Sequence, residues 1–386
     1  MAEEEENTIE IVRTAVRELA RKFDHEYWLN KDTNHEYPWE LVRALGEGGW
    51  LGIMFPEEYG GLGLGLQEAA VMMHEIAASG AGMAGASAIH SYVFPPAPLV
   101  KYGSEEMKQK YLPKLATGEM LTAFALTEPT AGVDTSRITT KAEKTEGGWL
   151  LNGQKVFISN AANAQRMVVL ARTSPRDEEH PLRGMTMFFA EKNDSMTLRE
   201  IPKLGRAAVD TNEVFIDDLF VADEDVIGEV GKGFHYIIDG LNPERVCVAM
   251  EGIGIGRAAL EIGVDYAKNR IVFDRPIGKN QAVAHPLADS WIRLEAAELA
   301  SMKAAKLFDE DKPCGPESAV AKYLGAEAGF EACDRAFGTL GGYAYAKEYH
   351  IERLWREVRL LRNAPFSQEM VRNFISQNVL GMPRSY

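Results

Sequence analysis

The first places to look for chemistry in this 386-residue sequence are its short glycine-containing segments and its eight histidines. Gly252, Gly254 and Gly256 begin like a dinucleotide-binding loop, but they lack the G-x-G-x-x-G spacing and the preceding strand of such a loop. They lie in a helical run, so we expect them to allow close helix packing. Residues 231–233 (Gly-Lys-Gly) lack the spacer and the Ser or Thr of a phosphate-binding loop. No two histidines stand four residues apart and none has a cysteine at ligand spacing, so the sequence predicts no metal site.

Length and composition limit the kind of protein that this chain can be. A chain of 386 residues is longer than a single hydrophobic core usually supports, which favours two or three domains. The formal net charge of −15 argues against a nucleic-acid-binding surface, while a local cationic site for an anionic ligand stays compatible with it. Three cysteines (Cys247, Cys314 and Cys333) are too few for a disulfide framework and suit a reducing compartment.

The ends and apolar runs of the chain bear on its location. Residues 1–7 are rich in glutamate and lack the basic and apolar parts of a signal peptide. No run approaches the ~18 consecutive apolar residues that a membrane span needs. We therefore expect a cytoplasmic protein without a membrane span.

Secondary structure must position the reactive side chains, and the first ~120 residues favour helices by their apolar periodicity. A capping-box-like sequence at residues 7–10 predicts a helix start, with apolar residues at helical spacing after it. Residues 56–63 are rich in turn-forming residues and predict a loop. Further helices are predicted at residues 38–48, 66–79, 93–102 and 105–116.

The pattern changes after residue 120 and again after residue 228. Short β-favouring segments separated by turn signals predict a small antiparallel sheet, and long helices return from residue 231. We expect an α+β multidomain fold with an N-terminal α-helical domain (1–120), a middle antiparallel β domain (121–228) and a four-helix-bundle-like C-terminal α-helical domain (229–386). The predicted strands are 149–151, 155–159, 167–172, 185–190 and 213–217, and the predicted C-terminal helices are 245–269, 284–308, 317–337 and 349–362.

One segment at the start of the predicted β domain carries a specific motif. Residues 123–134 read Ala-Phe-Ala-Leu-Thr-Glu-Pro-Thr-Ala-Gly-Val-Asp. This segment resembles the acyl-CoA dehydrogenase family, whose motif is Thr-Glu-Pro, two further residues and Gly-Ser-Asp at the entry to the middle domain. The chain departs from the motif at Val133, where the family usually has Ser.

Other blocks agree with the same family in order and spacing, so the resemblance covers nearly the whole chain. Residues 153–160 are similar to the family's Trp-Ile-Thr segment. Residues 270–281 resemble its FAD diphosphate block, and residues 340–356 repeat its C-terminal pattern. His90 and residues 101–107 match the N-terminal domain.

The resemblance implies an FAD-dependent acyl-CoA dehydrogenase, which removes two hydrogens across the α,β-carbons of an acyl thioester. Phe157 stands for the family's Trp and offers a flat apolar face to a flavin, while Thr127 and Ser159 offer short hydroxyls to its polar edge. Arg270 supplies a planar guanidinium for the diphosphate. The implied cofactor contacts are Phe124, Leu126, Thr127, Gly132, Val133, Phe157, Ser159, Arg270, Phe273, Gln281, Gly342 and Ser367. Family members bind FAD across a subunit interface, which sets Arg270, Phe273, Gln281 and Gly342 against the neighbour's cofactor; Gly338 stands where the family generally has Gln.

The implied reaction needs a carboxylate near the substrate Cα, because the α-proton of a thioester is weakly acidic. Hydride then passes from Cβ to flavin N5. Most family members carry the base in a Tyr-Glu-Gly-Thr segment near the C-terminus, where this chain has Pro365. Isovaleryl-CoA and long-chain acyl-CoA dehydrogenases carry it in a helical Leu-x-x-Glu-Arg segment, and residues 241–245 read Leu-Asn-Pro-Glu-Arg. We predict Glu244 as the general base, with Glu369 in reserve.

Two alternatives stay open at this position of the sequence. Glu244 could instead be a surface residue in the first turn of a helix that Asn242 caps and Pro243 begins. Pro365 has no N–H for the thioester carbonyl, so that donor would be the amide of Ala364 or Phe366, or a group elsewhere. The implied substrate contacts are Val133, Leu241, Arg245, Ala364 and Pro365.

The substrate class and partners follow only from the resemblance. Gly85 stands where glutaryl-CoA dehydrogenase has a carboxylate-binding Arg, which favours a neutral acyl group. The small residues 80–86 line a roomy pocket or allow a close helix contact, and Gly240 resembles the small residue that accommodates a branched chain in the isovaleryl enzyme. We expect a short branched or bulky acyl-CoA substrate, electron-transferring flavoprotein as electron acceptor, and a homotetramer (a dimer of dimers). The rival functions are an acyl-CoA oxidase, a non-oxidative eliminating relative, and a catalytically silent acyl-CoA-binding subunit.

Overall fold

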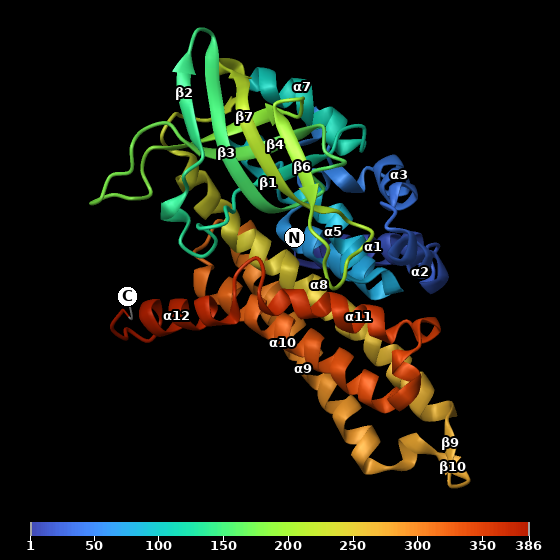
Figure 1. Ribbon diagram of the computed structural model, residues 1–386. Helices are drawn as coiled ribbons and strands as arrows, with labels where there is room; N and C mark the ends of the chain where they lie inside the picture. The colour runs from blue at the N-terminus through green and yellow to red at the C-terminus, as the bar shows by residue number, and fades with distance from the viewer. Residues whose placement is uncertain (1, 385–386) are drawn as a thin grey trace.

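Helices, a β-sheet and a second set of helices follow one another along the chain (Figure 1). This computed structural model describes residues 2–384. The order confirms the predicted α+β class with helical N- and C-terminal parts and a β-sheet middle part. None of the helices within the described residues is long and apolar enough to cross a membrane.

Among the N-terminal helices, α4 packs against α1 and α5, and its side chains are all buried. Two N-terminal helices begin at side-chain caps: Asp24 accepts a hydrogen bond from Tyr27 N, and Ser104 accepts one from Met107 N. The predicted start at residues 7–10 was wrong, because the first helix already begins at Ala2. The helices are α1 (Ala2–Ala20), α2 (His25–Asn34), α3 (Trp39–Glu47), α4 (Leu66–Ile76), α5 (Gly82–Val93), α6 (Ala97–Tyr102) and α7 (Glu105–Ala116).

The middle part is one eight-stranded sheet with the order β6-β7-β3-β2-β4-β5-β8, and β1 pairs with β4. The prediction of a purely antiparallel sheet was wrong, since β1 and β2 each pair with β4 in parallel. The two predicted segments 149–151 and 155–159 belong to a single strand with register shifts. The strands are β1 (Thr122–Ala125), β2 (Lys141–Thr145), β3 (Gly148–Ser159), β4 (Arg166–Arg172), β5 (Met185–Glu191), β6 (Met196–Glu200), β7 (Thr211–Ala222) and β8 (Val226–Ile227).

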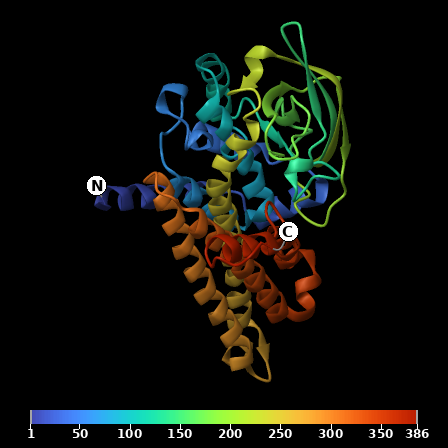
Figure 2. The same ribbon diagram turned by 90° about the vertical axis from the view of Figure 1, so that its left-hand side faces the viewer.

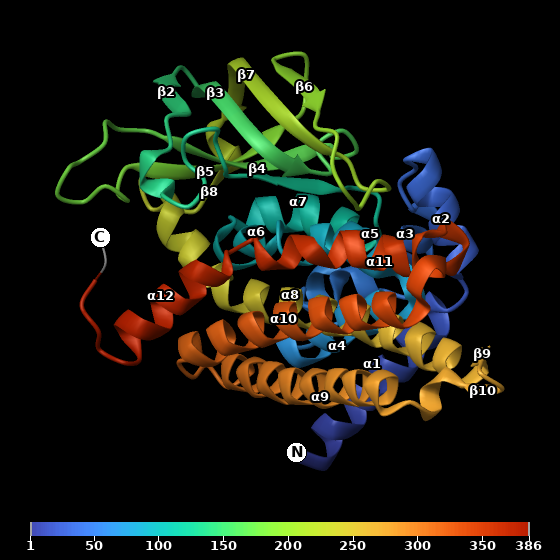
Figure 3. The ribbon, with the colours of Figure 1, turned by 60° about the horizontal axis from the view of Figure 1, so that its bottom comes forward.

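The C-terminal part is dominated by α8, which runs from the sheet to a small hairpin of β9 and β10 at the opposite end (Figures 1 and 2). Helices α9, α10 and α11 lie alongside one another (Figure 3). The predicted start of α8 at residue 245 was wrong, because the helix begins at Gly233 and contains Pro243. The elements are α8 (Gly233–Asn269), β9 (Ile271–Val272), β10 (Arg275–Pro276), α9 (Gln281–Asp309), α10 (Gly315–Leu340), α11 (Ile351–Val358) and α12 (Gln368–Asn378).

The glycines of α8 serve helix packing, as predicted. A Cβ added at Gly252 would lie 2.9 Å from the carbonyl oxygen of Gly325 on α10. A Cβ at Gly254 would lie 2.4 Å from the carbonyl oxygen of His74 on α4. A Cβ at Gly256 would lie 2.7 Å from the Leu294 side chain on α9. Larger residues at these positions would push the three helices away from α8.

Candidate active site

The loop after β1 and the strand β3 are tied together by their backbones and by a buried ion pair. Val156 N donates a hydrogen bond of 2.9 Å to Thr127 O. Lys155 Nζ donates to Glu128 Oε1 at 2.9 Å and to the carbonyl oxygens of Leu126 and Leu170. Thr127 is therefore held next to the residue that precedes Phe157.

Phe157 is turned outward by an irregularity in β3. Its φ is 60°, and it lies at the register shift between Lys155 and Ile158. The Phe157 side chain is 66% exposed, and Val133 is also exposed. A Cβ added to Gly132 would meet only the Thr127 side chain, at 3.9 Å. The segments on both sides of Thr127, the loop with Gly132 and Val133 and the strand with Phe157, therefore leave apolar groups open to solvent.

Ser159 lies at the end of β3, where its hydroxyl accepts a hydrogen bond of 2.9 Å from Arg206 Nη2. Arg206 belongs to the loop between β6 and β7, and it also donates to Thr211 and to Ser87 on α5. The sequence interpretation missed Arg206, because no local pattern links that loop to β3. Phe124 lies further inside, with its ring centroid 4.9 Å from that of Phe94.

Glu244 lies on α8 with only 9% of its surface exposed. Its carboxylate makes no hydrogen bond or ion pair with any residue between 2 and 384. Burial raises the pKa of Glu244 to about 7; His90 and Arg245 oppose this rise, and the charge of Glu251 adds to it. The alternative of an exposed glutamate in a first helical turn is wrong, since α8 begins at Gly233.

The segment around Pro365 meets α8 through Arg245. The Arg245 guanidinium carbon lies 4.8 Å from the ring centroid of Phe366 and 5.5 Å from that of Phe374. Leu241, one turn before Arg245, is half-buried and packs against a cluster of buried residues that includes Tyr236 and Ile237. The structure thus brings residues 241–245 and 364–367 together, although more than 100 positions separate them in the sequence.

The backbone around Pro365 narrows the choice of a hydrogen-bond donor. Ala364 N already donates to Leu360 O at 3.0 Å. Ser367 accepts a hydrogen bond from Met370 N and so caps α12. No partner within residues 2–384 accepts from Phe366 N. Glu369, the reserve base, is exposed and forms an ion pair of 3.3 Å with Arg372.

Four predicted cofactor contacts belong to the far end of α8, where Figure 1 shows the β9–β10 hairpin. Arg270 and Phe273 flank β9, Gln281 begins α9, and Gly342 follows the end of α10. Arg270 and Gly342 line a cavity of about 470 Å³, and the Arg270 guanidinium carbon lies 5.5 Å from the ring centroid of Tyr343. Phe273, at the hairpin, is 93% exposed. Arg270 directly follows the end of α8, ~38 Å beyond Glu244 at about 1.5 Å per residue. Within one chain, Arg270, Phe273, Gln281 and Gly342 are not brought together with Phe157.

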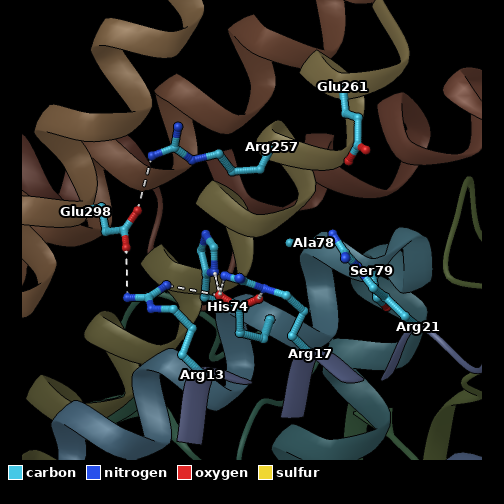
Figure 4. A pocket seen from close by; sticks show the side chains of 10 residues that line it. Arg13, Arg17, Arg21, His74, Ala78, Ser79, Arg257, Glu261 and Glu298 are labelled. Carbon is cyan, nitrogen blue, oxygen red and sulfur yellow. Dashed lines mark hydrogen bonds and ion pairs between the residues drawn. The ribbon is translucent and has the colours of Figure 1, made fainter. Parts of the chain in front are cut away.

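A second cavity, of about 280 Å³, is polar and lies between α1, α4, α8 and α9 (Figure 4). Glu75 accepts hydrogen bonds from Arg13 at 2.9 Å and from Arg17 at 2.8 Å. Glu298 accepts from Arg13 at 3.3 Å and from Arg257 at 3.1 Å, as the dashed lines in Figure 4 mark. These ion pairs attach α1 to the other helices. No group of three or more potential metal ligands occurs in residues 2–384.

Models of three domains of one family match the chain. The acyl-CoA dehydrogenase N-terminal domain matches residues 4–119, the middle domain residues 123–219, and the C-terminal domain residues 231–380. The chain belongs to the acyl-CoA dehydrogenase family. Members of this family use FAD and dehydrogenate acyl-CoA thioesters, so this acyl-CoA dehydrogenase is an FAD-dependent oxidoreductase.

Relatives of this acyl-CoA dehydrogenase match it over almost its full length. The acyl-CoA dehydrogenase FadE12 of Mycobacterium tuberculosis is 37% identical over 382 residues, which cover 97% of this chain and 96% of that protein. The mitochondrial isovaleryl-CoA dehydrogenase of Solanum tuberosum is 33% identical and covers 97% of this chain and 89% of its own length. The structure of a glutaryl-CoA dehydrogenase with glutaryl-CoA is similar at a TM-score of 0.91 and 32% identity, over 98% of this chain and 96% of its own.

Proposed function

We propose that this acyl-CoA dehydrogenase uses Glu244 as the general base that removes the α-proton of the acyl thioester. The observation that carries the proposal is a buried carboxylate without an ion-pair partner in the described chain, with a pKa of about 7. A base of this pKa is partly ionised at neutral pH and still holds a proton well, which suits the abstraction of a weakly acidic C–H proton. Glu369 is the weaker candidate, because it is exposed and paired with Arg372.

The residues beside Thr127 fit a flavin. The exposed ring of Phe157 can pack on a flat ring system, and the Ser159 hydroxyl lies at the edge of the same surface. When bound, FAD would supply the hydride acceptor for the substrate Cβ. Arg270 is suited to a diphosphate, but it lies too far along α8 to reach a flavin on Phe157 of its own chain.

That separation supports an assembly in which one chain completes the cofactor site of another. We assign Arg270, Phe273, Gln281 and Gly342 to the cofactor of a neighbouring copy, in the homotetramer expected for this family. Electron-transferring flavoprotein is the electron acceptor that we propose. A solved structure named for the electron-transferring flavoprotein of Acidaminococcus fermentans is similar to this chain, at a TM-score of 0.90 and 31% identity.

The proposed substrate carries a neutral, short branched or bulky acyl group. Gly85 cannot be replaced by a carboxylate-binding side chain without displacing Trp28, whose ring lies 2.9 Å from a Cβ added at Gly85. The helix therefore packs closely against Trp28 at Gly85. The alternative that residues 80–86 line a roomy pocket is wrong at this position. Gly240 faces Phe94, with 3.5 Å between an added Cβ and the ring. A larger residue at Gly240 would fill the space beside that ring, so glycine there favours a bulky acyl group.

An anaerobic titration with a panel of acyl-CoAs, followed by flavin absorbance, tests this function. We expect neutral branched acyl-CoAs to bleach the flavin and glutaryl-CoA to leave it yellow. Glu244→Gln should abolish bleaching, while Glu369→Gln, the matched control, should retain it. Bleaching by the Glu244→Gln variant at the wild-type rate would disprove the base assignment.

The departure at Pro365 favours one second candidate, a catalytically silent acyl-CoA-binding subunit. Such a protein would bind acyl-CoA and FAD, and no acyl-CoA would bleach it. Oxygen consumption at the rate of turnover would point instead to an oxidase, and loss of a substrate leaving group without flavin reduction to an eliminating relative.

A further inference from the structure

A second carboxylate and a histidine lie behind Glu244. Glu251 is fully buried on α8, seven residues after Glu244, so both carboxylates lie on the same face of the helix. Glu251 Oε1 is 2.8 Å from Nδ1 of His90 on α5. The other oxygen of Glu251 has no hydrogen-bond partner within the described residues. An ionised carboxylate in this position requires a compensating cation.

His90 is the closest candidate for that cation. Burial opposes protonation of the His90 ring, but the charge and hydrogen bond of Glu251, helped by the charge of Glu244, hold the pKa of His90 above its usual value. The proton on Nδ1 then lies in the hydrogen bond to Glu251. The largely shielded His90 ring and the buried Glu251 carboxylate form a hydrogen-bonded pair near Glu244, which is an imidazolium–carboxylate pair when the ring is protonated.

Three other groups complete the electrostatic surroundings. Arg245 and the Cys247 thiol lie on α8 next to Glu244. Arg206, from the loop between β6 and β7, acts on both Glu251 and His90. Arg206 also donates to Ser159, so the same cluster reaches the edge of the proposed flavin surface.

We propose that His90 and Glu251 form a positioning pair that sets the proton affinity of Glu244. This inference rests on the proposed role of Glu244 as the base. With both members present, the positive His90 ring offsets the negative Glu251 carboxylate, so the pair as a whole has little electrostatic effect on the ionisation of Glu244. Removal of the ring alone would leave two carboxylates on one side of α8, two turns apart and without the positive ring, and Glu244 would keep its proton to a higher pH.

The test is the pH profile of flavin reduction, measured by anaerobic stopped-flow with the most active acyl-CoA. In the wild type we expect the rate of flavin reduction to rise with pH as Glu244 ionises. This rise is the acid limb of the pH profile. His90→Gln should move this acid limb upward by roughly one pH unit. The double variant His90→Gln/Glu251→Gln should return it toward the wild-type position, because both charges are removed together. Glu251→Gln alone should leave the limb near the wild-type position, because His90 loses the charge and hydrogen bond that hold its proton and both charges disappear together.

The upward shift in His90→Gln and its reversal in the double variant separate an electrostatic role from a merely structural one. A loss of packing would lower the rate at every pH and would not be repaired by a second substitution. If His90→Gln fails to fold, His90→Asn takes its place in the same comparison, and an unchanged or lowered limb there overturns the pair. An inactive Glu244→Gln together with a wild-type limb in His90→Gln would also overturn the pair and leave the base intact. A fully active Glu244→Gln variant would instead disprove the assignment of Glu244 as the base, and the inference about His90 and Glu251 would fail with it.

Discussion

Lys155 Nζ lies 2.9 Å from Glu128 Oε1, and both side chains are shielded from solvent. The second Glu128 oxygen accepts hydrogen bonds from the amide and hydroxyl of Thr139. Burial opposes the ionisation of Glu128, but the Lys155 charge and these hydrogen bonds outweigh it and lower the pKa of Glu128. Both members of the pair are close in sequence to a proposed flavin contact. Glu128 directly follows Thr127, and Lys155 precedes Phe157 by two residues. The pair therefore ties together the two segments that carry these contacts.

Glu128→Gln should lower both stability and FAD affinity, because it leaves the Lys155 ammonium buried without its counter-charge. Breaking a buried pair typically costs about 3–5 kcal/mol. We expect a lower thermal unfolding temperature and loss of FAD on gel filtration. Glu143→Gln is the matched control, since Glu143 pairs with Lys141 on the exposed side of β2 and should contribute less than about 1 kcal/mol. Equal effects of the two substitutions would contradict the special role of the buried pair.

The distance between Phe157 and Arg270 makes the shared cofactor site testable by subunit mixing. Phe157→Ala and Arg270→Ala should each weaken FAD binding in every site of their own assemblies. When the two variants are unfolded and refolded together, each mixed pair of chains would contain one site with both native residues. We expect partial recovery of bound FAD, measured by flavin absorbance per chain. Recovery no greater than the average of the separate variants would show that one chain supplies both residues to the same cofactor.

Glu75 should make the attachment of α1 sensitive to acid. Burial raises its pKa, but hydrogen bonds from His74 and Arg17 outweigh this and hold the pKa at about 2. A depressed pKa means that Glu75 stabilises the fold above the pKa of its unfolded form, and that this contribution is lost as the pH falls toward 2. Glu75→Gln should lower the free energy of unfolding at pH 7 by ~3 kcal/mol and flatten its decline in acid. Glu261 lines the same cavity and makes no ion pair in the described chain, so Glu261→Gln is the control. The unfolding curve of this variant should match that of the wild type.

The free amide of Phe366 is the best remaining donor to the thioester carbonyl near Pro365. Phe366→Pro removes the N–H, while Phe366→Ala removes only the ring. Loss of an oxyanion donor typically costs ~10²-fold in rate, so Phe366→Pro should reduce flavin much more slowly than Phe366→Ala. The carbonyl stretch of a bound ¹³C-labelled thioester should also shift to higher frequency in the proline variant. Equal rates and equal stretches would place the donor elsewhere.

Local patterns in the sequence predicted elements whose signals lie within one segment. Helix α7 (Glu105–Ala116) has the predicted bounds, because Ser104 caps it and its apolar residues keep a helical period. Helix α8 did not follow its local pattern. Pro243 is typical of a helix start, but here it lies inside a helix of 37 residues that other elements hold on both sides. Helix α5, rich in glycine and alanine, was also missed, since its packing against Trp28 is not visible in its own residues.

The family motifs, the residue types available for a flavin and a base, and the proline in place of glutamate at position 365 are all readable in the amino-acid sequence. The tertiary structure decided that Glu244 is buried beside His90 and Glu251, that Arg206 reaches Ser159, and that Arg270 lies far from Phe157. The reason is physical: burial, pKa and distance depend on how elements remote in the sequence pack together. A motif names a side chain, but only packing determines which charges surround it and how strongly it holds a proton.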